Sequence, residues 1–91
     1  MKSILQDEKE CYITHRKYPL HEHHIFGGGK RKISEANGFK VWLTPELHNM
    51  SDIGVHFNRL FDLRLKRDCQ RKFEETHSRE EFMQLIGRNY L

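Results

Sequence analysis

Three consecutive glycines, Gly27 to Gly29, separate two short segments with the character of β-strands, and this arrangement constrains the fold most. Residues 21–26 alternate in polarity and end in the apolar pair Ile25-Phe26, which favours a strand. Glycine offers no side chain to pack and loses much conformational freedom in a strand, so we expect this strand to end at the glycines. Residues 39–43 alternate β-branched and aromatic side chains and should form a second strand.

Helix signals follow the second strand. Thr44 and Pro45 are typical of an N-cap and a first helical position, which predicts a short helix carrying His48, interrupted at about residues 51–54. Periodic apolar residues predict longer helices at about 55–76 and 79–90, the second of which opens with a capping box. Before the second strand we expect a basic turn at residues 30–32. Residues 34–38 should form one helical turn or a loop closed by glycine. The predicted fold class is therefore α+β.

The length and composition allow one domain with a modest core. Of the 91 residues, 36% are hydrophobic and 32% are charged, so a bound metal would help the domain to stay folded. Residues 1–10 are charged and aperiodic, and we expect them to form a loose lead-in to a single domain at residues 11–91. The formal charge of +3 permits nucleic-acid binding without demonstrating it.

The apolar segments and the two cysteines bear on location. No apolar run approaches the roughly 18 residues of a membrane span, and the N-terminus lacks the apolar stretch of a signal peptide. We therefore expect no membrane partner and a cytoplasmic location. Cys11 and Cys69 belong to no CxxC pair, so they cannot form a zinc site alone, and nothing in the sequence supports a disulfide between them.

Five of the seven histidines lie at positions 21, 23, 24, 48 and 56. If the two strands pair antiparallel, the end of the first strand and the start of the helix meet, so His23 and His24 would face His48, and His56 could reach the same point. Three imidazoles with an open fourth position are the ligand set of a catalytic divalent metal site. Adjacent residues in a strand point to opposite faces, so one histidine of the pair should bind the ion while the other is free to accept a proton. His21 could support a metal ligand or replace one, but we favour its interpretation as an exposed strand residue.

This pattern resembles the HNH endonucleases, which have the ββα-metal (His-Me finger) fold, and especially their small stand-alone versions in bacteriophages and prophages. The resembling segments are the His23-His24-Ile25 run, the glycine loop, residues 43–48 and residues 54–56. The resemblance covers roughly residues 11–60. It implies a ββα-metal core at about residues 20–60, followed by additional C-terminal helices at about 55–76 and 79–90.

The resemblance also implies an activity, namely metal-dependent hydrolysis of DNA phosphodiester bonds by an endonuclease. In that family the second histidine of the pair is the general base, which maps to His24. In that family the first histidine of the pair and the two downstream histidines hold one divalent ion on the scissile phosphate. These ligands map to His23, His48 and His56. Imidazole ligands favour zinc, nickel or manganese, whereas magnesium would depend partly on phosphate and water. The expected setting is the cytoplasm of a bacterial or phage-infected host cell.

The chain departs from the family pattern at three places. The family's middle Asn, which orients the base, would fall near Phe39, so Asn37 is the candidate for that role. Many family members hold a structural zinc with paired cysteines, and this chain resembles a version without it. The spacing of eight positions between His48 and His56 is longer than the common four to five.

Two alternatives stay open at this stage. Lys30, Arg31 and Lys32 are predicted to contact DNA phosphates, although a solvated charged turn is nearly as good an interpretation. The competing function is a non-catalytic module, either one that binds nucleic acid and is stabilised by a metal or one that regulates a phage complex.

Overall fold

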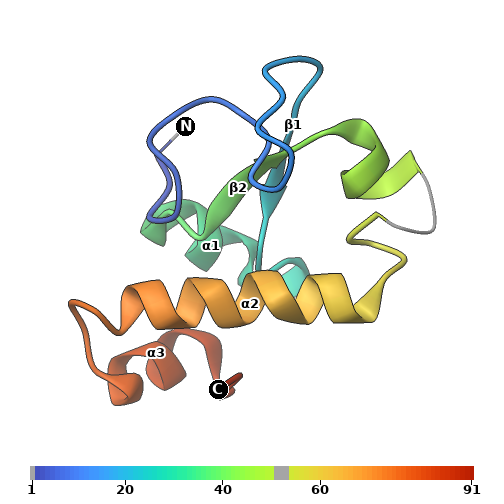
Figure 1. Ribbon diagram of the computed structural model, residues 1–91. Coiled ribbons are helices and arrows are strands. Elements are labelled where there is room, and N and C mark those ends of the chain that lie inside the picture. Colours follow the sequence, from blue (N-terminus) through green and yellow to red (C-terminus); the bar gives the residue numbers. More distant parts are fainter. Residues whose placement is uncertain (1, 51–53) are drawn as a thin grey trace.

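The computed structural model describes residues 2–50 and 54–91, and it has an α+β architecture (Figure 1). Its elements in chain order are β1 (His21–His24), the short 3-10 helix η1 (Gly28–Lys30), α1 (Arg31–Asn37), β2 (Lys40–Leu43), the π-helical turn η2 (Glu46–Met50), α2 (Arg59–Phe73) and α3 (Arg79–Ile86). Every helix in the described part of the chain is too short or too polar to traverse a lipid bilayer.

The two predicted strands exist and pair antiparallel, with His23 opposite Val41 and His24 opposite Lys40. β1 ends at His24, two residues earlier than predicted, although the Ile25 amide still donates to the Phe39 carbonyl at 2.9 Å. The glycines do not form a tight turn between the strands. They lead through η1 into α1, so a helix is inserted within the strand connection.

The helix α1 replaces the basic turn and single helical turn that the sequence predicts. Gly38 ends it with a φ of 71°, in the left-handed region that glycine adopts most easily. The buried hydroxyl of Ser34 accepts from the Phe26 amide and donates to the Phe26 carbonyl. This pair of hydrogen bonds attaches α1 to the end of the first strand.

The core lies between the sheet and the two C-terminal helices. α2 runs beneath the sheet, and α3 packs beside α2 (Figure 1). The ring of Phe39 contacts rings from both helices, with centroid distances of 5.5 Å to Phe73 and 6.2 Å to Phe82. The apolar residues predicted on α2 include Leu65 and Cys69, which are fully buried. Cys11 is also buried, and both thiols are free.

Both C-terminal helices are shorter than predicted because each has a well-defined cap. α2 begins at Arg59, since the side chain of Asn58 accepts from the Phe61 amide, and residues 54–57 form a turn instead of helix. The capping box at Ser78 is confirmed, and α3 ends where Gly87 adopts a φ of 83°. The predicted interruption at 51–54 falls mostly on residues 51–53, which lie outside the described residues.

The N-terminal segment is not loose, contrary to the expectation from its composition. The Ile4 amide donates to the Gly38 carbonyl, Gln6 Oε1 accepts from the Trp42 amide, and the Tyr12 amide donates to the Trp42 carbonyl. The two bonds to Trp42 use polar groups on the free edge of β2, so the segment covers an edge strand that would otherwise be exposed. A side chain at position 38 would meet the backbone of this segment at 3.1 Å.

Candidate metal centre

Three imidazoles meet at one end of the sheet, and they come from three different elements. His23 lies in β1, His48 in η2 and His56 in the turn before α2. Their candidate ligand atoms all lie within 4.8 Å of one another, and the ring centroids are separated by 4.7 to 5.3 Å. The sequence analysis named these three residues, and the fold brings them together within reach of one ion.

Backbone hydrogen bonds explain how the chain brings His56 to His48 across eight positions. The Thr44 carbonyl accepts from the amides of Leu47 and His48, which turns the chain back after β2. The Val55 amide then donates to the Leu47 carbonyl, and the His56 amide donates to the His48 carbonyl. His48 and His56 are therefore neighbours through their backbones, and their Nε2 atoms lie 3.0 Å apart.

The cluster favours neutral rings, as a metal site requires. Burial first, and then the neighbouring rings of His48 and His56, lower the pKa of His23 to about 3. Burial, followed by the neighbouring His56, lowers the pKa of His48 to about 4. At neutral pH both rings keep an unprotonated nitrogen, which is the form that binds a metal.

One atom of the cluster lacks a partner. The side chain of His23 is buried, and its Nε2 has no hydrogen-bond partner among the described residues. A buried polar atom without a partner costs free energy, commonly about 1–3 kcal/mol. A divalent cation bound by the three rings would supply the missing partner, so the residues present fit a metal ion.

His24 belongs to a separate cluster on the other face of β1. Its ring is largely buried, and its Nε2 lies 3.1 Å from Glu35 Oε1 and 3.7 Å from Glu22 Oε1. The buried ammonium of Lys40 contacts Glu35 and lies 3.7 Å from Glu22. Hydrogen bonds from Lys40 and then from His24 hold the pKa of Glu35 below its ordinary value.

The ligand atoms of Glu22, His24 and Glu35 are also close enough to hold an ion. Lys40, however, already places a positive charge against both carboxylates, and a divalent ion would have to displace it or bear its repulsion. At the three-histidine cluster, the charge of Lys66 affects the pKa of His23 less than burial and the other imidazoles do, and Lys66 is already paired with Asp62. The three-histidine cluster is therefore the better candidate for a metal centre.

Asn37 does not lie where an orienting residue of His24 would be. Its Nδ2 donates instead to the Ile33 carbonyl at 2.8 Å within α1, and the carboxylate of Glu35 contacts the His24 ring. Residues two apart on a helix point in nearly opposite directions, so the formation of α1 separates Asn37 from Glu35. The sequence predicts only one helical turn or a loop here, so its local pattern does not indicate this separation.

The basic residues predicted to contact phosphate lie at the junction of η1 and α1. Lys30, Arg31 and Lys32 are all exposed, and none of them forms an ion pair with a described residue. Arg31 and Lys32 belong to the first turn of α1 and not to a turn between elements. Their charges are available to an anionic partner.

Two groups of residues have contacts that the favoured sequence interpretation does not include. His21 is not a simple exposed strand residue, because its Nδ1 lies 3.1 Å from Nδ1 of His48. The period of two in a strand places His21 on the same face as His23, and this signal was available in the sequence. Glu35 and Lys40 carry no comparable local signal, since only the packing of α1 beside the sheet brings them to His24.

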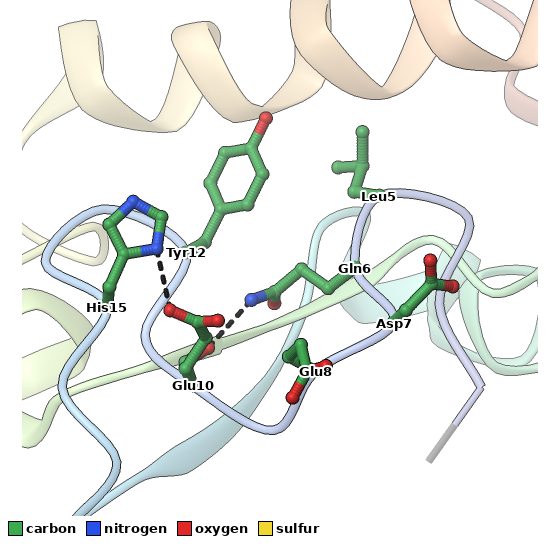
Figure 2. A pocket seen from close by; sticks show the side chains of 7 residues that line it. All are labelled: Leu5, Gln6, Asp7, Glu8, Glu10, Tyr12 and His15. Atoms are coloured by element: carbon green, nitrogen blue, oxygen red, sulfur yellow. Dashed lines mark hydrogen bonds and ion pairs between the residues drawn. The ribbon is translucent and has the colours of Figure 1, made fainter.

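Two surface pockets are candidates for a binding site. The first, about 420 Å³, opens beside the exposed ring of His56 and is also lined by Asn58 and Arg59. The second, about 260 Å³, lies in the N-terminal segment and is rich in carboxylates (Figure 2). There Glu10 already pairs with His15 at 2.7 Å and with Lys17 at 3.6 Å, so its charge is compensated. Of these two pockets, the one beside His56 borders a member of the three-histidine cluster.

The candidate site thus consists of a three-histidine cluster, a pocket opening beside its exposed member, and a second cluster around His24 across the strand. The first supplies neutral donors for a cation, and the second compensates its own charges. Comparison of the chain with family models, with curated proteins and with solved structures found no match to any of them.

Proposed function

We propose that this chain is a metal-dependent endonuclease of the HNH type that hydrolyses DNA phosphodiester bonds, with a ββα-metal core formed by β1, β2 and η2. The observation that carries the proposal is the meeting of three imidazoles, of which His23 has a buried Nε2 without a partner among the described residues. Such a set of donors matches a catalytic divalent ion with open coordination positions.

The three histidines hold the ion in this proposal. A bound divalent cation stabilises the negative charge that grows on the phosphate during hydrolysis. Imidazole donors favour zinc, nickel or manganese over magnesium, which prefers oxygen ligands. The exposed ring of His56 borders the pocket lined by Arg59 and Asp62, so this member of the cluster is accessible from solvent.

His24 is the proposed general base. When its Nε2 hydrogen is donated to Glu35, its Nδ1 keeps a lone pair that can accept a proton from water. A carboxylate hydrogen-bonded to one ring nitrogen fixes the tautomer and the orientation of the ring. Glu35 therefore takes the orienting role that the sequence analysis assigned to Asn37.

DNA is the proposed substrate because the exposed basic side chains at the junction of η1 and α1 can contact phosphates. The net charge is +3, and Lys30, Arg31 and Lys32 are exposed without ion pairs to described residues. Contacts from such side chains position a nucleic acid without reading its sequence. The proposal therefore includes binding that weakens as salt concentration rises.

One observation favours a second candidate, a metal-stabilised binding module without catalysis. Nε2 of His24 is bonded to Glu35 on the face of β1 that carries the compensated cluster, and the three-histidine group does not include His24. In a binding module the ion would only tie together β1, η2 and the turn before α2. Such a protein would bind the same metals and would leave DNA intact.

Cleavage of supercoiled plasmid distinguishes the two candidates. The full chain is incubated with Mg²⁺, Mn²⁺, Zn²⁺ or Ni²⁺ in turn, beside a chelator control. We expect nicking or cleavage with at least one ion and none with chelator. His24→Ala should slow cleavage by about 10²–10⁴-fold, the usual contribution of a general base, while Zn²⁺ affinity stays at the wild-type value.

The matched control is His15→Ala, which removes an exposed histidine outside both clusters and should leave the rate unchanged. Zn²⁺ binding without cleavage under any of the four ions would favour the binding module. Equal rates for His24→Ala and the wild type would remove His24 from the reaction.

A further inference from the structure

His48 uses both of its ring nitrogens, and a histidine outside the three-ligand cluster contacts one of them. Its Nε2 faces His56 Nε2 at 3.0 Å, and its Nδ1 faces His21 Nδ1 at 3.1 Å. The rings of His21 and His48 meet edge to face, with centroids 5.2 Å apart and an interplanar angle of 80°. His21 therefore touches a proposed metal ligand on the side opposite to the cluster.

The strand register places His21 there. His21 and His23 are two residues apart in β1 and share one face, and His21 pairs with Leu43, the last residue of β2. The chain turns immediately after Leu43, at Thr44, to form η2 and bring His48 back over the sheet. The same backbone geometry that delivers His48 to His23 thus also delivers it to His21.

A neutral imidazole carries one hydrogen, so its two nitrogens must divide the roles of donor and acceptor. For Nε2 of His48 to bind an ion, it must carry a lone pair, and the hydrogen must then lie on Nδ1. That hydrogen points to Nδ1 of His21, which accepts it. The contact therefore selects the tautomer of His48 that is competent to bind a metal, and it also restrains the orientation of the ring.

We propose that His21 is a positioning residue of the metal centre, which accepts a hydrogen bond from Nδ1 of His48 and thereby presents Nε2 of His48 to the ion. This inference rests on the proposed metal centre and extends it by one residue. His21 does not belong to the group whose ligand atoms lie within 4.8 Å of one another, so its role is exerted through His48.

Two substitutions of His21 separate this role from simple packing. His21→Leu keeps a side chain of moderate size but offers no acceptor. His21→Asn keeps an oxygen, Oδ1, at nearly the position of Nδ1 and can accept from His48. We expect His21→Leu to weaken Zn²⁺ binding by about 10–100-fold, the usual effect of losing a partner of a metal-bound histidine. His21→Asn should stay within a few-fold of the wild type.

The measurements are Zn²⁺ affinity by competition with a chromophoric chelator and the ¹⁵N resonances of His48 in the Zn²⁺-loaded protein. In the wild type and in His21→Asn, Nδ1 of His48 should carry its hydrogen in a hydrogen bond, and in His21→Leu this signature should be lost. Thermal unfolding in chelator reports any general loss of stability separately. A structural role alone would lower the unfolding temperature and leave affinity and tautomer unchanged.

The outcomes also distinguish this inference from the proposed function. Wild-type affinity in His21→Leu would overturn the inference and leave the metal centre standing. Tight Zn²⁺ binding that depends on His21, in a protein that cleaves no DNA, would support the inference and overturn the nuclease. A wild type that binds none of the four ions would overturn both.

Discussion

The two faces of β1 carry histidines in opposite electrostatic settings. On one face, His23 and His21 contact other imidazoles, and no carboxylate belongs to the three-histidine cluster. On the other face, His24 lies among the carboxylates of Glu22 and Glu35, with the buried ammonium of Lys40 between them. Four residues of one strand thus divide into two chemically distinct clusters.

The difference shows what each face can bind. The first face gathers neutral donors, and their electrostatic complement is a cation supplied from outside the chain. The second face already contains its cation, because Lys40 offsets the two acidic side chains. Strand alternation alone separates the two settings, since consecutive side chains point to opposite sides.

The largest expected effect comes from removing a ligand on the first face. We expect His48→Ala to weaken Zn²⁺ binding by at least roughly 100-fold, because it removes one of three ligands and the backbone-positioned neighbour of His56. The measurement is a competition titration against a chelator. Glu35→Gln is the matched variant on the second face and should bind Zn²⁺ normally. A loss of Zn²⁺ binding in Glu35→Gln and not in His48→Ala would place the ion in the cluster around His24 and contradict the three-histidine site.

A second substitution tests whether Lys40 compensates the other face. Lys40→Met keeps an apolar side chain of similar length and removes the charge, which leaves His24 beside two uncompensated carboxylates. Breaking a fully buried ion pair costs about 3–5 kcal/mol, and because the Glu22 and Glu35 side chains are 33% and 57% exposed, we expect a smaller but measurable loss in the free energy of unfolding.

The measurement is denaturant unfolding of Lys40→Met in chelator. Lys72→Met is the control, because Lys72 is half exposed and pairs with Glu75, which lies just after the end of α2. Exposed pairs of this kind contribute less than about 1 kcal/mol. Equal stabilities for the two variants would mean that Lys40 does not balance the charges around His24.

The smallest expected effect is a pH dependence of the metal-free protein. The pKa of His23 in the folded state is about 3, below the ordinary histidine value of 6.5, so the unfolded chain binds a proton first as the pH falls. The contribution of neutral His23 is present above about pH 6.5 and is lost as the pH falls toward the folded-state pKa. Between pH 7 and pH 5 we expect a loss on the order of 1–2 kcal/mol in the free energy of unfolding.

Chemical unfolding at the two pH values, in chelator, measures this loss. His23→Asn cannot take up a proton in this range, so it should lose less stability over the same interval than the wild type does. If the wild type and His23→Asn show the same pH dependence, the cluster tolerates a charged ring at His23, which contradicts this prediction.

Several elements followed from local rules. The strand character of residues 21–24 and 40–43, the capping box at Ser78 and the apolar stripe of α2 were all recognisable in the sequence and are confirmed. The grouping of His23, His48 and His56 was also anticipated, since a turn after the second strand returns the chain to the first. These features depend on periodicity, capping and turn chemistry, which act over a few residues.

Other features could not be predicted in this way. The N-terminal segment reads as a charged lead-in, yet its amides and its Gln6 side chain pair with the edge of β2. Glu35, and not the predicted Asn37, contacts His24. This contact depends on the full length of α1 and on its attachment through Ser34. Such contacts join residues that are distant in the sequence, so no local sequence pattern predicts them.

The sequence by itself determined which residue types are present and which alternate along β1, and therefore that its histidines must divide between two faces. Only the tertiary structure decided which face receives imidazoles and which receives carboxylates and Lys40. The physical reason is that alternation is a property of the extended backbone, whereas the partners on each face arrive from η2, α1 and β2 through packing and backbone hydrogen bonds.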